Sequence, residues 1–313
     1  MTEVGDEVTV AILGGGSIGV AFAVLFAREG FEVAVYDSVD AALPRASSEL
    51  GDRLAQCGAR CAPRVRFTSD LASAVDGAGF VQECAPERLD LKQDLFRRAA
   101  ALTSPSVPLV SSSSAIVPSA LAAGLGPAVS ARILVGHPGN PPYLLPVVEV
   151  VPSPETAEPI VQQALSLYRS AGMRPVRVRR EVEGFVFNRL QGALLREAYC
   201  LVRDGVATVD DIDEVVRSGL GRRWSFMGPF ETADLNTRGG IESHAAKMGP
   251  AYERMGAERG QHDPWTPELV AQVTAQRRAI LDLADWEDRV RWRDRKLTGL
   301  AAALDADRAV EIG

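Results

Sequence analysis

A glycine-rich turn, Gly14–Gly19 (GGGSIG), follows directly on an apolar run. In a strand–turn–helix unit, the first glycine of this pattern permits the tight turn. The second lets the backbone approach a pyrophosphate, and the third lets the helix pack on the strand. We assign these roles to Gly14, Gly16 and Gly19. The pattern and its flanking strands favour a dinucleotide-binding fold over a glycine-rich loop without a ligand.

The residues around this turn indicate which dinucleotide is bound. The helix expected to begin at Ser17 would point its first amides, those of Ser17 and Ile18, at the phosphates. Asp37 closes the next apolar run, where its carboxylate can accept both ribose hydroxyls of the adenosine half. A 2′-phosphate would meet that negative charge, and the first basic residue after it is Arg45. We therefore expect NAD rather than NADP.

Length and charge exclude several other classes of protein. The chain has 313 residues and a net charge of −7, which suggests two domains and does not favour a nucleic-acid partner. No apolar run has the length of a membrane span, and Met1–Glu7 has no apolar signal region, so we expect a cytoplasmic protein. The four cysteines lack the histidine or cysteine partners of a metal site, and we expect reduced thiols and no metal.

The first half of the chain alternates strand and helix patterns. This alternation is typical of an α/β fold with a Rossmann-type, doubly wound and mostly parallel sheet. We expect this domain over residues 1–183 and an all-helical domain over 184–313. The predicted strands are Val8–Leu13, Glu32–Tyr36, Gly79–Glu83, Val107–Ser111, Arg132–His137, Val147–Val151 and Pro175–Arg179.

Capping and breaking residues mark the helices of the second half. A helix is predicted over Gly184–Arg203, and Thr208 resembles the first residue of a capping box that opens the next helix. Proline at a first helical position predicts helices beginning near Pro229 and Pro267. The last helix is predicted over Trp286–Leu304.

One histidine and one glutamate stand out as candidate catalytic groups. His137 ends a buried strand, where ligands of open α/β sheets bind. Glu149 lies between valines, and an ionised carboxylate there is costly unless it is paired. The proline-rich segment between them predicts a hairpin-like return that brings the carboxylate to the imidazole. The alternative is an edge-strand glutamate that faces water.

Two further polar groups are candidates only because of their positions. The run Ser111–Ser114 follows a predicted strand, so one of its hydroxyls can donate to a reacting oxygen rather than belong to an ordinary polar loop. Asn188 stands near the start of the first helix of the second half, where its amide can donate to a substrate oxygen. Taken alone, Asn188 is better explained as an ordinary residue of an amphipathic helix.

Together these features resemble the 3-hydroxyacyl-CoA dehydrogenase superfamily, and within it the lambda-crystallin and L-gulonate 3-dehydrogenase branch. The resemblance extends over nearly the whole chain. The segments that carry it are Gln82–Lys92 (QECAPERLDLK), His137–Tyr143 (HPGNPPY), Gly184–Gln191 (GFVFNRLQ), Gly219–Trp224 (GLGRRW), Gly228–Glu231 (GPFE) and Trp292–Asp294 (WRD).

The resemblance implies NAD as cofactor and a role for each matching residue. His137 would be the catalytic acid and base with Glu149 as its partner, while Ser114 and Asn188 would contact the substrate oxygen. Tyr143 would also contact the substrate. The residues implied near the cofactor are Glu87, Lys92, Ser112 and Asn140.

One departure from the family bears on the substrate. Acyl-CoA members carry a long helical arm that grips CoA, whereas the matching segment here is only Ser38–Thr68 and contains no lysine. This favours the 3-hydroxyl of a small, free hydroxy acid. Two alternatives stay open: a dehydrogenase of acyl-CoA or acyl-carrier-protein thioesters, and a non-catalytic, crystallin-like protein that binds NAD.

Substrate anchoring and assembly give two further expectations. Arginine binds a carboxylate in a bidentate manner, and Arg223 lies in a predicted glycine-containing turn, Gly219–Ser225, where the related branch also has an arginine. The alternative is that Arg223 is one more surface cation. The resemblance and the apolar content of the helical domain, including Trp265, Trp286 and Trp292, predict a homodimer.

Asp37 generates a test of cofactor choice. We expect NADH to bind more tightly than NADPH, because the carboxylate repels the 2′-phosphate. Replacing Asp37 with alanine should narrow the gap by removing that charge. Fluorescence titration with both nucleotides measures the difference, and equal affinities in the unmodified protein would contradict the assignment.

Overall fold

The computed structural model describes residues 8–57, 63–225, 228–236 and 240–260, together with short stretches between 268 and 302. The contacts between residues group the chain into two compact units. The first includes the sheet and reaches Arg189, and the second begins at Leu190.

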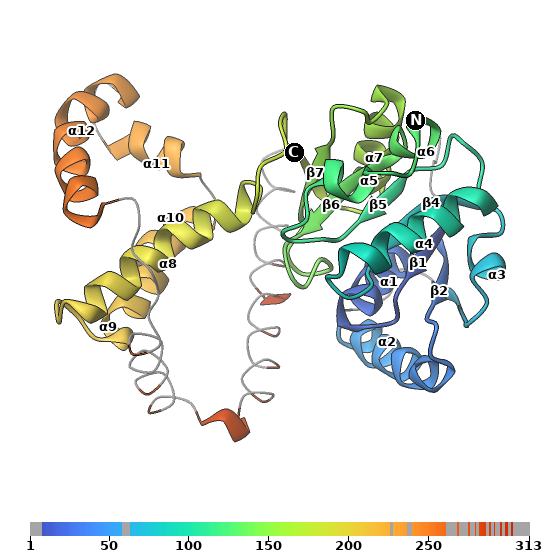
Figure 1. The fold of residues 1–313 in the computed structure, drawn as a ribbon. Coiled ribbons are helices and arrows are strands. Elements are labelled where there is room, and N and C mark those ends of the chain that lie inside the picture. Colours follow the sequence, from blue (N-terminus) through green and yellow to red (C-terminus); the bar gives the residue numbers. More distant parts are fainter. Residues whose placement is uncertain are drawn as a thin grey trace, which may run out of the picture. The chain divides into compact units, whose positions relative to one another are not determined.

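An eight-stranded sheet forms the centre of the first unit, in the order β3-β2-β1-β4-β5-β6-β7-β8 (Figure 1). Every neighbouring pair is parallel except β6 and β7. The doubly wound, mostly parallel fold predicted from the sequence is therefore confirmed. The strands are β1 Thr9–Leu13, β2 Glu32–Tyr36, β3 Arg64–Thr68, β4 Ala78–Glu83, β5 Leu109–Ser111, β6 Ile133–Pro138, β7 Val147–Pro152 and β8 Arg174–Arg177.

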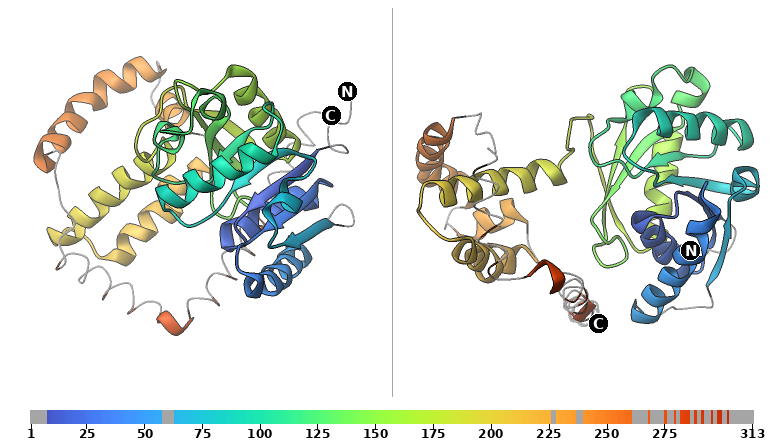
Figure 2. Two further views of the ribbon diagram at one scale, coloured as in Figure 1. Left: turned by 45° about the vertical axis from the view of Figure 1, so that its right-hand side comes forward. Right: turned by 60° about the horizontal axis from the view of Figure 1, so that its bottom comes forward.

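Helices cover both faces of the sheet (Figure 2). On one face lie α1 Ser17–Arg28, α2 Leu43–Cys57 and α7 Glu158–Ser170, and on the other α3 Leu71–Val75, α4 Leu89–Leu102 and α5 Pro118–Ala122. The short α6, Pro127–Ser130, follows α5. Because both faces are covered, the central strands are mostly apolar, and Val10 to Leu13 of β1 are fully buried.

Strand β3, which lies at one edge of the sheet, was not predicted from the sequence. Its sequence, Arg64–Thr68, alternates arginine with apolar residues, and those apolar side chains are only partly buried. Arg64 and Arg66 place charge on the open edge, which discourages pairing with another chain. The segment before it folds as a 3₁₀ turn, η1 Asp40–Ala42, and the single helix α2.

A buried tyrosine occupies the space next to the strand that carries His137. The Tyr168 hydroxyl donates to Gln82 Oε1 at 2.6 Å, and the ring is fully buried among aromatic side chains. A Cβ at Gly136 would overlap that hydroxyl. Only glycine therefore fits at position 136 while Tyr168 keeps this place.

The described residues after Phe187 form helices, as predicted. The capping box at Thr208 is confirmed, because its hydroxyl accepts from the Asp211 amide while the Asp211 carboxylate accepts from the Thr208 amide. None of the helices in the described ranges is both long and apolar enough to cross a membrane. The helices are α8 Phe187–Arg203, α9 Val209–Glu214, α10 Gly221–Trp224, α11 Pro229–Asn236 and α12 Gly240–Arg259, with a π-helical segment, η2 Val215–Leu220, and a 3₁₀ turn, η3 Leu283–Asp285.

Two local predictions in this half were wrong. The segment predicted as a turn at Gly219–Ser225 is helical, because α9, η2 and α10 follow one another without a break. Helix α8 begins at Phe187 rather than Gly184, since Gly184 and Phe185 adopt left-handed conformations with φ of 75° and 49°. The helix start predicted near Pro267 and most of the helix predicted over Trp286–Leu304 lie outside the described residues.

Candidate active site

The antiparallel pair β6–β7 brings His137 and Glu149 together. The two residues are directly opposite in the strand register, and His137 Nδ1 lies 2.8 Å from Glu149 Oε2. Their side chains are 9% and 4% exposed. The alternative of a water-facing glutamate on an edge strand was wrong, because β8 pairs with β7 on its other side. The hairpin-like return predicted from the sequence thus produces a buried hydrogen bond.

The second oxygen of Glu149 binds the backbone at the start of α8. Glu149 Oε1 accepts from the amides of Val186 at 2.7 Å and Phe187 at 3.0 Å. A carboxylate that accepts from two amides is suited to accept a third hydrogen bond from His137 Nδ1–H. This assignment leaves His137 Nε2 without a proton and able to act as a base.

A left-handed turn presents those two amides to Glu149. Gly184 and Phe185 both have positive φ, which is unusual for a phenylalanine and costs on the order of 1–3 kcal/mol. The Phe185 ring is fully buried, with its centroid 5.6 Å from that of His137. Burial of such a side chain contributes about 1.5–3 kcal/mol and offsets the strain. Phe185 was not predicted as a site residue.

The four serines after β5 have different environments. Ser111 is buried and donates to Glu83, and Ser113 is buried and donates to Glu87. Ser112 donates its amide to the Glu83 carbonyl at 2.8 Å. Ser114 is exposed, and its carbonyl accepts from Asn188 Nδ2 at 3.0 Å. The structure therefore brings Ser114 and Asn188, both predicted to contact the substrate oxygen, into direct contact.

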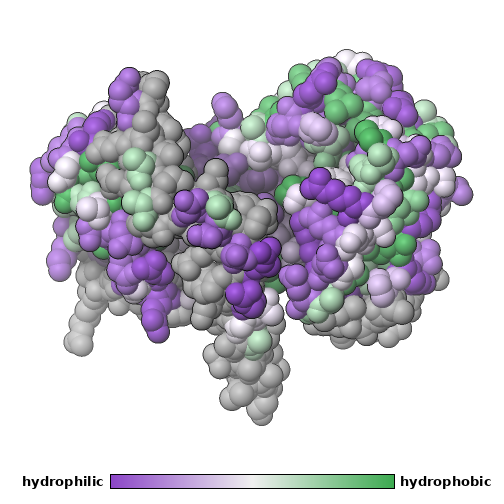
Figure 3. Space-filling view, turned by 90° about the horizontal axis from the view of Figure 1, so that it is seen from below, coloured by the Kyte–Doolittle hydropathy of each residue, from purple (hydrophilic) through white to green (hydrophobic). Residues whose placement is uncertain are grey.

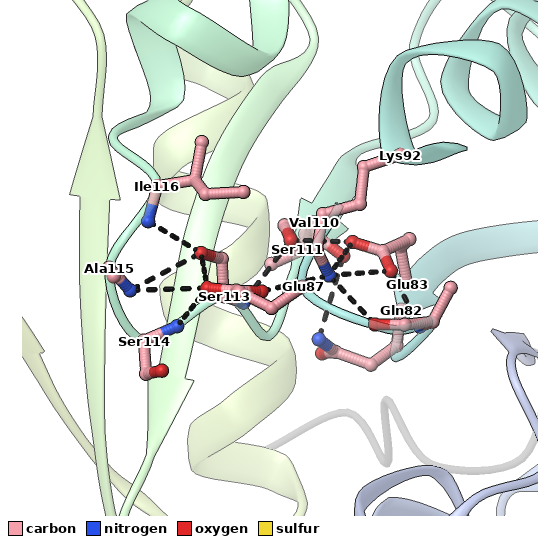
Figure 4. Close-up of polar contacts among 11 residues, drawn as sticks. Gln82, Glu83, Glu87, Lys92, Val110, Ser111, Ser113, Ser114, Ala115 and Ile116 are labelled. Carbon is pink, nitrogen blue, oxygen red and sulfur yellow. Dashed lines mark hydrogen bonds and ion pairs between the residues drawn. The ribbon is translucent and has the colours of Figure 1, made fainter. Parts of the chain in front are cut away.

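A buried ion pair between Lys92 and Glu83 lies beside this serine loop (Figure 4). Lys92 Nζ lies 2.9 and 3.0 Å from the two oxygens of Glu83, donates to the Ala85 carbonyl at 3.0 Å, and lies 3.3 Å from Glu87 Oε2. The side chains of Glu83 and Lys92 are almost completely buried. Burial raises the pKa of Glu83, against the opposing effect of the Lys92 charge. Glu83 was not predicted as a site residue, because it is the last residue of a segment that was read only as a buried strand.

The glycine-rich turn fits a dinucleotide. Gly14 has φ of 120°, and a Cβ there would lie 2.7 Å from the Cys84 carbonyl oxygen. A Cβ at Gly19 would collide with the Gly14 carbonyl, whereas one at Gly16 would meet no atom within 4 Å. The space that is empty of protein thus lies at Gly16, where the pyrophosphate is expected. No side chain caps the N-terminus of α1, where the amides of Ser17 and Ile18 were predicted to bind the phosphates.

Asp37 joins this turn to the end of β2. Its Oδ2 accepts from the Gly15 amide at 2.9 Å, and its Oδ1 accepts from the Val39 amide at 3.0 Å. Each carboxylate oxygen still has a lone pair for a ribose hydroxyl. A residue that the sequence did not single out, Arg53 of α2, donates to the carbonyl and hydroxyl of Ser17, both at 3.0 Å.

Three further predicted residues, Asn140, Tyr143 and Arg223, differ in the surroundings that the structure gives each side chain. Asn140 is exposed just after β6, and Tyr143 is 7% exposed in the core, with its ring centroid 5.9 Å from the Arg53 guanidinium. Arg223 is half-buried in α10 of the second unit. Their roles stay predictions. Within the described ranges, no group of three or more His, Cys, Asp or Glu side chains is arranged to hold a metal.

Comparison with known proteins gives consistent matches along the chain. Residues 9–182 match the model of the 3-hydroxyacyl-CoA dehydrogenase NAD binding domain, and residues 184–285 match that of the 3-hydroxyacyl-CoA dehydrogenase C-terminal domain. L-carnitine dehydrogenase of Pseudomonas aeruginosa is 39% identical over 99% of this chain and 98% of its own. Lambda-crystallin of Oryctolagus cuniculus is 37% identical over 93% of this chain and 95% of its own.

A solved structure is similar over the same length. It is that of 5-formyl-3-hydroxy-2-methylpyridine 4-carboxylic acid 5-dehydrogenase, described as an NAD⁺-dependent dismutase. The match has a TM-score of 0.80 and 30% identity, and it covers 95% of this chain and 98% of that one.

The fold and these matches define an NAD-dependent oxidoreductase that acts on a CH–OH group. The chain belongs to the 3-hydroxyacyl-CoA dehydrogenase family. The resemblance found in the sequence, including that to the lambda-crystallin-like branch, is thereby confirmed.

Gly16 and Gly19 of the turn provide a matched test of the cofactor site. Gly19→Ala should destabilise the protein by about 1–3 kcal/mol, because the new methyl group meets backbone. Gly16→Ala should change stability by less than about 0.5 kcal/mol but weaken NADH binding, because the methyl group fills the space for the pyrophosphate. Urea unfolding and NADH fluorescence measure the two effects. Wild-type NADH affinity in Gly16→Ala would contradict this placement.

Proposed function

We propose that the protein oxidises the 3-hydroxyl of a small hydroxy acid, and reduces the corresponding keto acid in the reverse direction. The observation that carries the proposal is the buried His137–Glu149 hydrogen bond, in which Glu149 is held by two backbone amides. His137 Nε2 accepts the hydroxyl proton during oxidation and returns it during reduction. Glu149 fixes the tautomer of the imidazole and stabilises the imidazolium that forms.

Ser114 and Asn188 complete the proposed catalytic group. The Asn188 amide has two N–H groups, of which one donates to the Ser114 carbonyl, so the other can donate to the substrate oxygen. The exposed Ser114 hydroxyl can donate to the same oxygen, and together they would polarise the carbonyl during reduction. NAD⁺, when bound, supplies the hydride acceptor. The cradle at Gly14, Gly16 and Gly19 would hold its pyrophosphate, and Asp37 its adenosine ribose.

The size of the proposed substrate rests on the segment after β2. In its described residues this segment forms the 3₁₀ turn η1, the helix α2 and a short edge strand, and its sequence contains no lysine to meet the phosphates of CoA. The similarity to an L-carnitine dehydrogenase supports a free hydroxy acid as well. A panel of L-carnitine, gulonate and 3-hydroxybutyrate against 3-hydroxybutyryl-CoA, followed by NADH absorbance, tests this choice. Turnover of the thioester alone would favour the acyl-CoA alternative, and no turnover at all would favour the crystallin-like one.

The proposed catalytic pair can be tested by substitutions that replace each titratable group with a neutral amide. His137→Gln should reduce turnover about 10²–10⁴-fold while leaving NADH binding intact, because only the base is removed. Glu149→Gln should cause a smaller loss, since the imidazole remains. The control is Glu158→Gln, which removes an exposed carboxylate at the start of α7. Steady-state kinetics and NADH titration separate the two effects, and near-full activity in His137→Gln would reject the assignment.

Arg223 is our candidate for the group that anchors the substrate carboxylate. Arg223→Met should raise KM for the acid far more than it changes NADH affinity, because a bidentate ion pair is lost. It should also improve the relative use of an ester analogue. The neighbouring, exposed Arg222 provides the control, since Arg222→Met changes the net charge equally. An unchanged KM in Arg223→Met would place the anchor elsewhere.

We also propose a homodimer formed through the helical half. Large apolar side chains of this half are more than half exposed, among them Leu190, Val206, Val215 and Phe230. Figure 3 shows one face of the molecule, on which hydrophobic residues reach the surface among hydrophilic ones. Trp265, Trp286 and Trp292 lie outside the described residues. Light scattering should give twice the mass of the chain at micromolar concentration, and a monomer would refute the proposal.

A further inference from the structure

The strand order locates the two halves of the bound dinucleotide. The order reverses between β1 and β4, and dinucleotides bind across this point at the carboxyl ends of the strands. Asp37, at the end of β2, marks the side of the adenosine half. The nicotinamide half therefore lies over the ends of β4 and β5. These strands end at Glu83 and Ser111, where the network of Figure 4 begins.

Within this network, Glu83 and Lys92 neutralise each other. The Glu83 carboxylate accepts four hydrogen bonds from three donor groups: the Ala85 amide, the Ser111 hydroxyl, and Lys92 Nζ, which donates to both oxygens. A carboxylate surrounded only by donors is suited to its ionised form. Because neither side chain reaches solvent, the pair has no exposed charge of its own.

Glu87 adds a carboxylate that has no separate cation in the network. Its Oε2 lies 3.3 Å from Lys92, which is already bound to Glu83, and its side chain is 40% exposed. Its Oε1 accepts from the Ser114 and Ala115 amides and from the Ser113 hydroxyl. Burial alone would raise the pKa of Glu87, but the Ser113 hydroxyl and the Lys92 charge outweigh it and lower the pKa. Two carboxylates and one ammonium leave one net negative charge.

We propose that Glu87 shifts the relative affinity of the protein for the two oxidation states of the cofactor, by stabilising bound NAD⁺ relative to bound NADH. The nicotinamide ring is positively charged in NAD⁺ and neutral in NADH, whereas the phosphates and the adenosine half are the same in both. An unneutralised carboxylate at the nicotinamide end thus attracts only one of the two forms. This inference depends on NAD binding and not on the substrate proposed above.

A purely structural role for Glu87 predicts a different result. If Glu87 served only to hold the loop from Ser113 to Ala115, its loss would weaken both forms of the cofactor alike. The ratio of the two dissociation constants would then stay constant. The ratio therefore separates an electrostatic effect from a change in the shape of the site.

The experiment measures both dissociation constants without substrate. NADH is titrated by fluorescence, and NAD⁺ by its competition with NADH. In Glu87→Gln, the ratio of Kd for NAD⁺ to Kd for NADH should rise about threefold to tenfold, as expected when a half-exposed charge is removed beside a charged ligand. The control is Glu32→Gln, which removes a similarly exposed carboxylate at the opposite end of the sheet and should leave the ratio unchanged. An unchanged ratio in folded Glu87→Gln would overturn the proposal.

Two further measurements keep the test decisive. The double variant Glu83→Gln with Lys92→Met removes the ion pair but keeps the net charge, so its ratio should match that of the unmodified protein. A rise like that of Glu87→Gln would assign the effect to loop geometry instead. If Glu87→Gln does not fold, raising the salt concentration with the unmodified protein should raise the ratio by screening Glu87. A ratio independent of salt would then contradict the inference.

Discussion

The Glu149 carboxylate is the interaction on which the candidate site depends. Its two oxygens accept from three donors, which come from β6 and from the backbone at the start of α8. A hydrogen bond to a charged group contributes about 1.5–3 kcal/mol, and a buried carboxylate left without partners costs more than this. The carboxylate is therefore favourable only with all three donors in place. The state of the imidazole and the conformation of the turn at Gly184 and Phe185 are thus linked through one side chain.

The His137–Glu149 pair and the network of Glu83, Glu87 and Lys92 have different roles at the carboxyl edge of the sheet. The first places one carboxylate beside one imidazole, which in the proposed function would accept and return the proton of the substrate hydroxyl. The second buries Lys92 between two carboxylates, and its hydrogen bonds fix the loop that presents Ser114. Lys92 can be buried because Glu83 and the Ala85 carbonyl satisfy its donors. Both networks rely on strand ends, which the sheet holds in place.

The sequence was sufficient to predict those site residues whose function is reflected in a local sequence pattern. The glycine turn and Asp37 were identified because each position has its own steric or electrostatic requirement. Glu149 was paired with His137 because an ionised group between valines requires a partner. Strand β3 was missed because an edge strand needs only one apolar face. The left-handed Phe185 and the buried Glu83 could not be predicted, since their conformation and partners come from segments distant in sequence.

The packing of Tyr168 against Gly136 has a consequence for how this sequence can diverge. The hydroxyl that fills the place of a side chain at Gly136 donates to Gln82 of β4, which lies two strands away from β6 in the sheet. A larger residue at position 136, next to His137, would thus require a simultaneous change on α7. In proteins that evolve from this sequence, the residues at positions 136 and 168 should therefore change together or both be kept, although 32 positions separate them in the sequence.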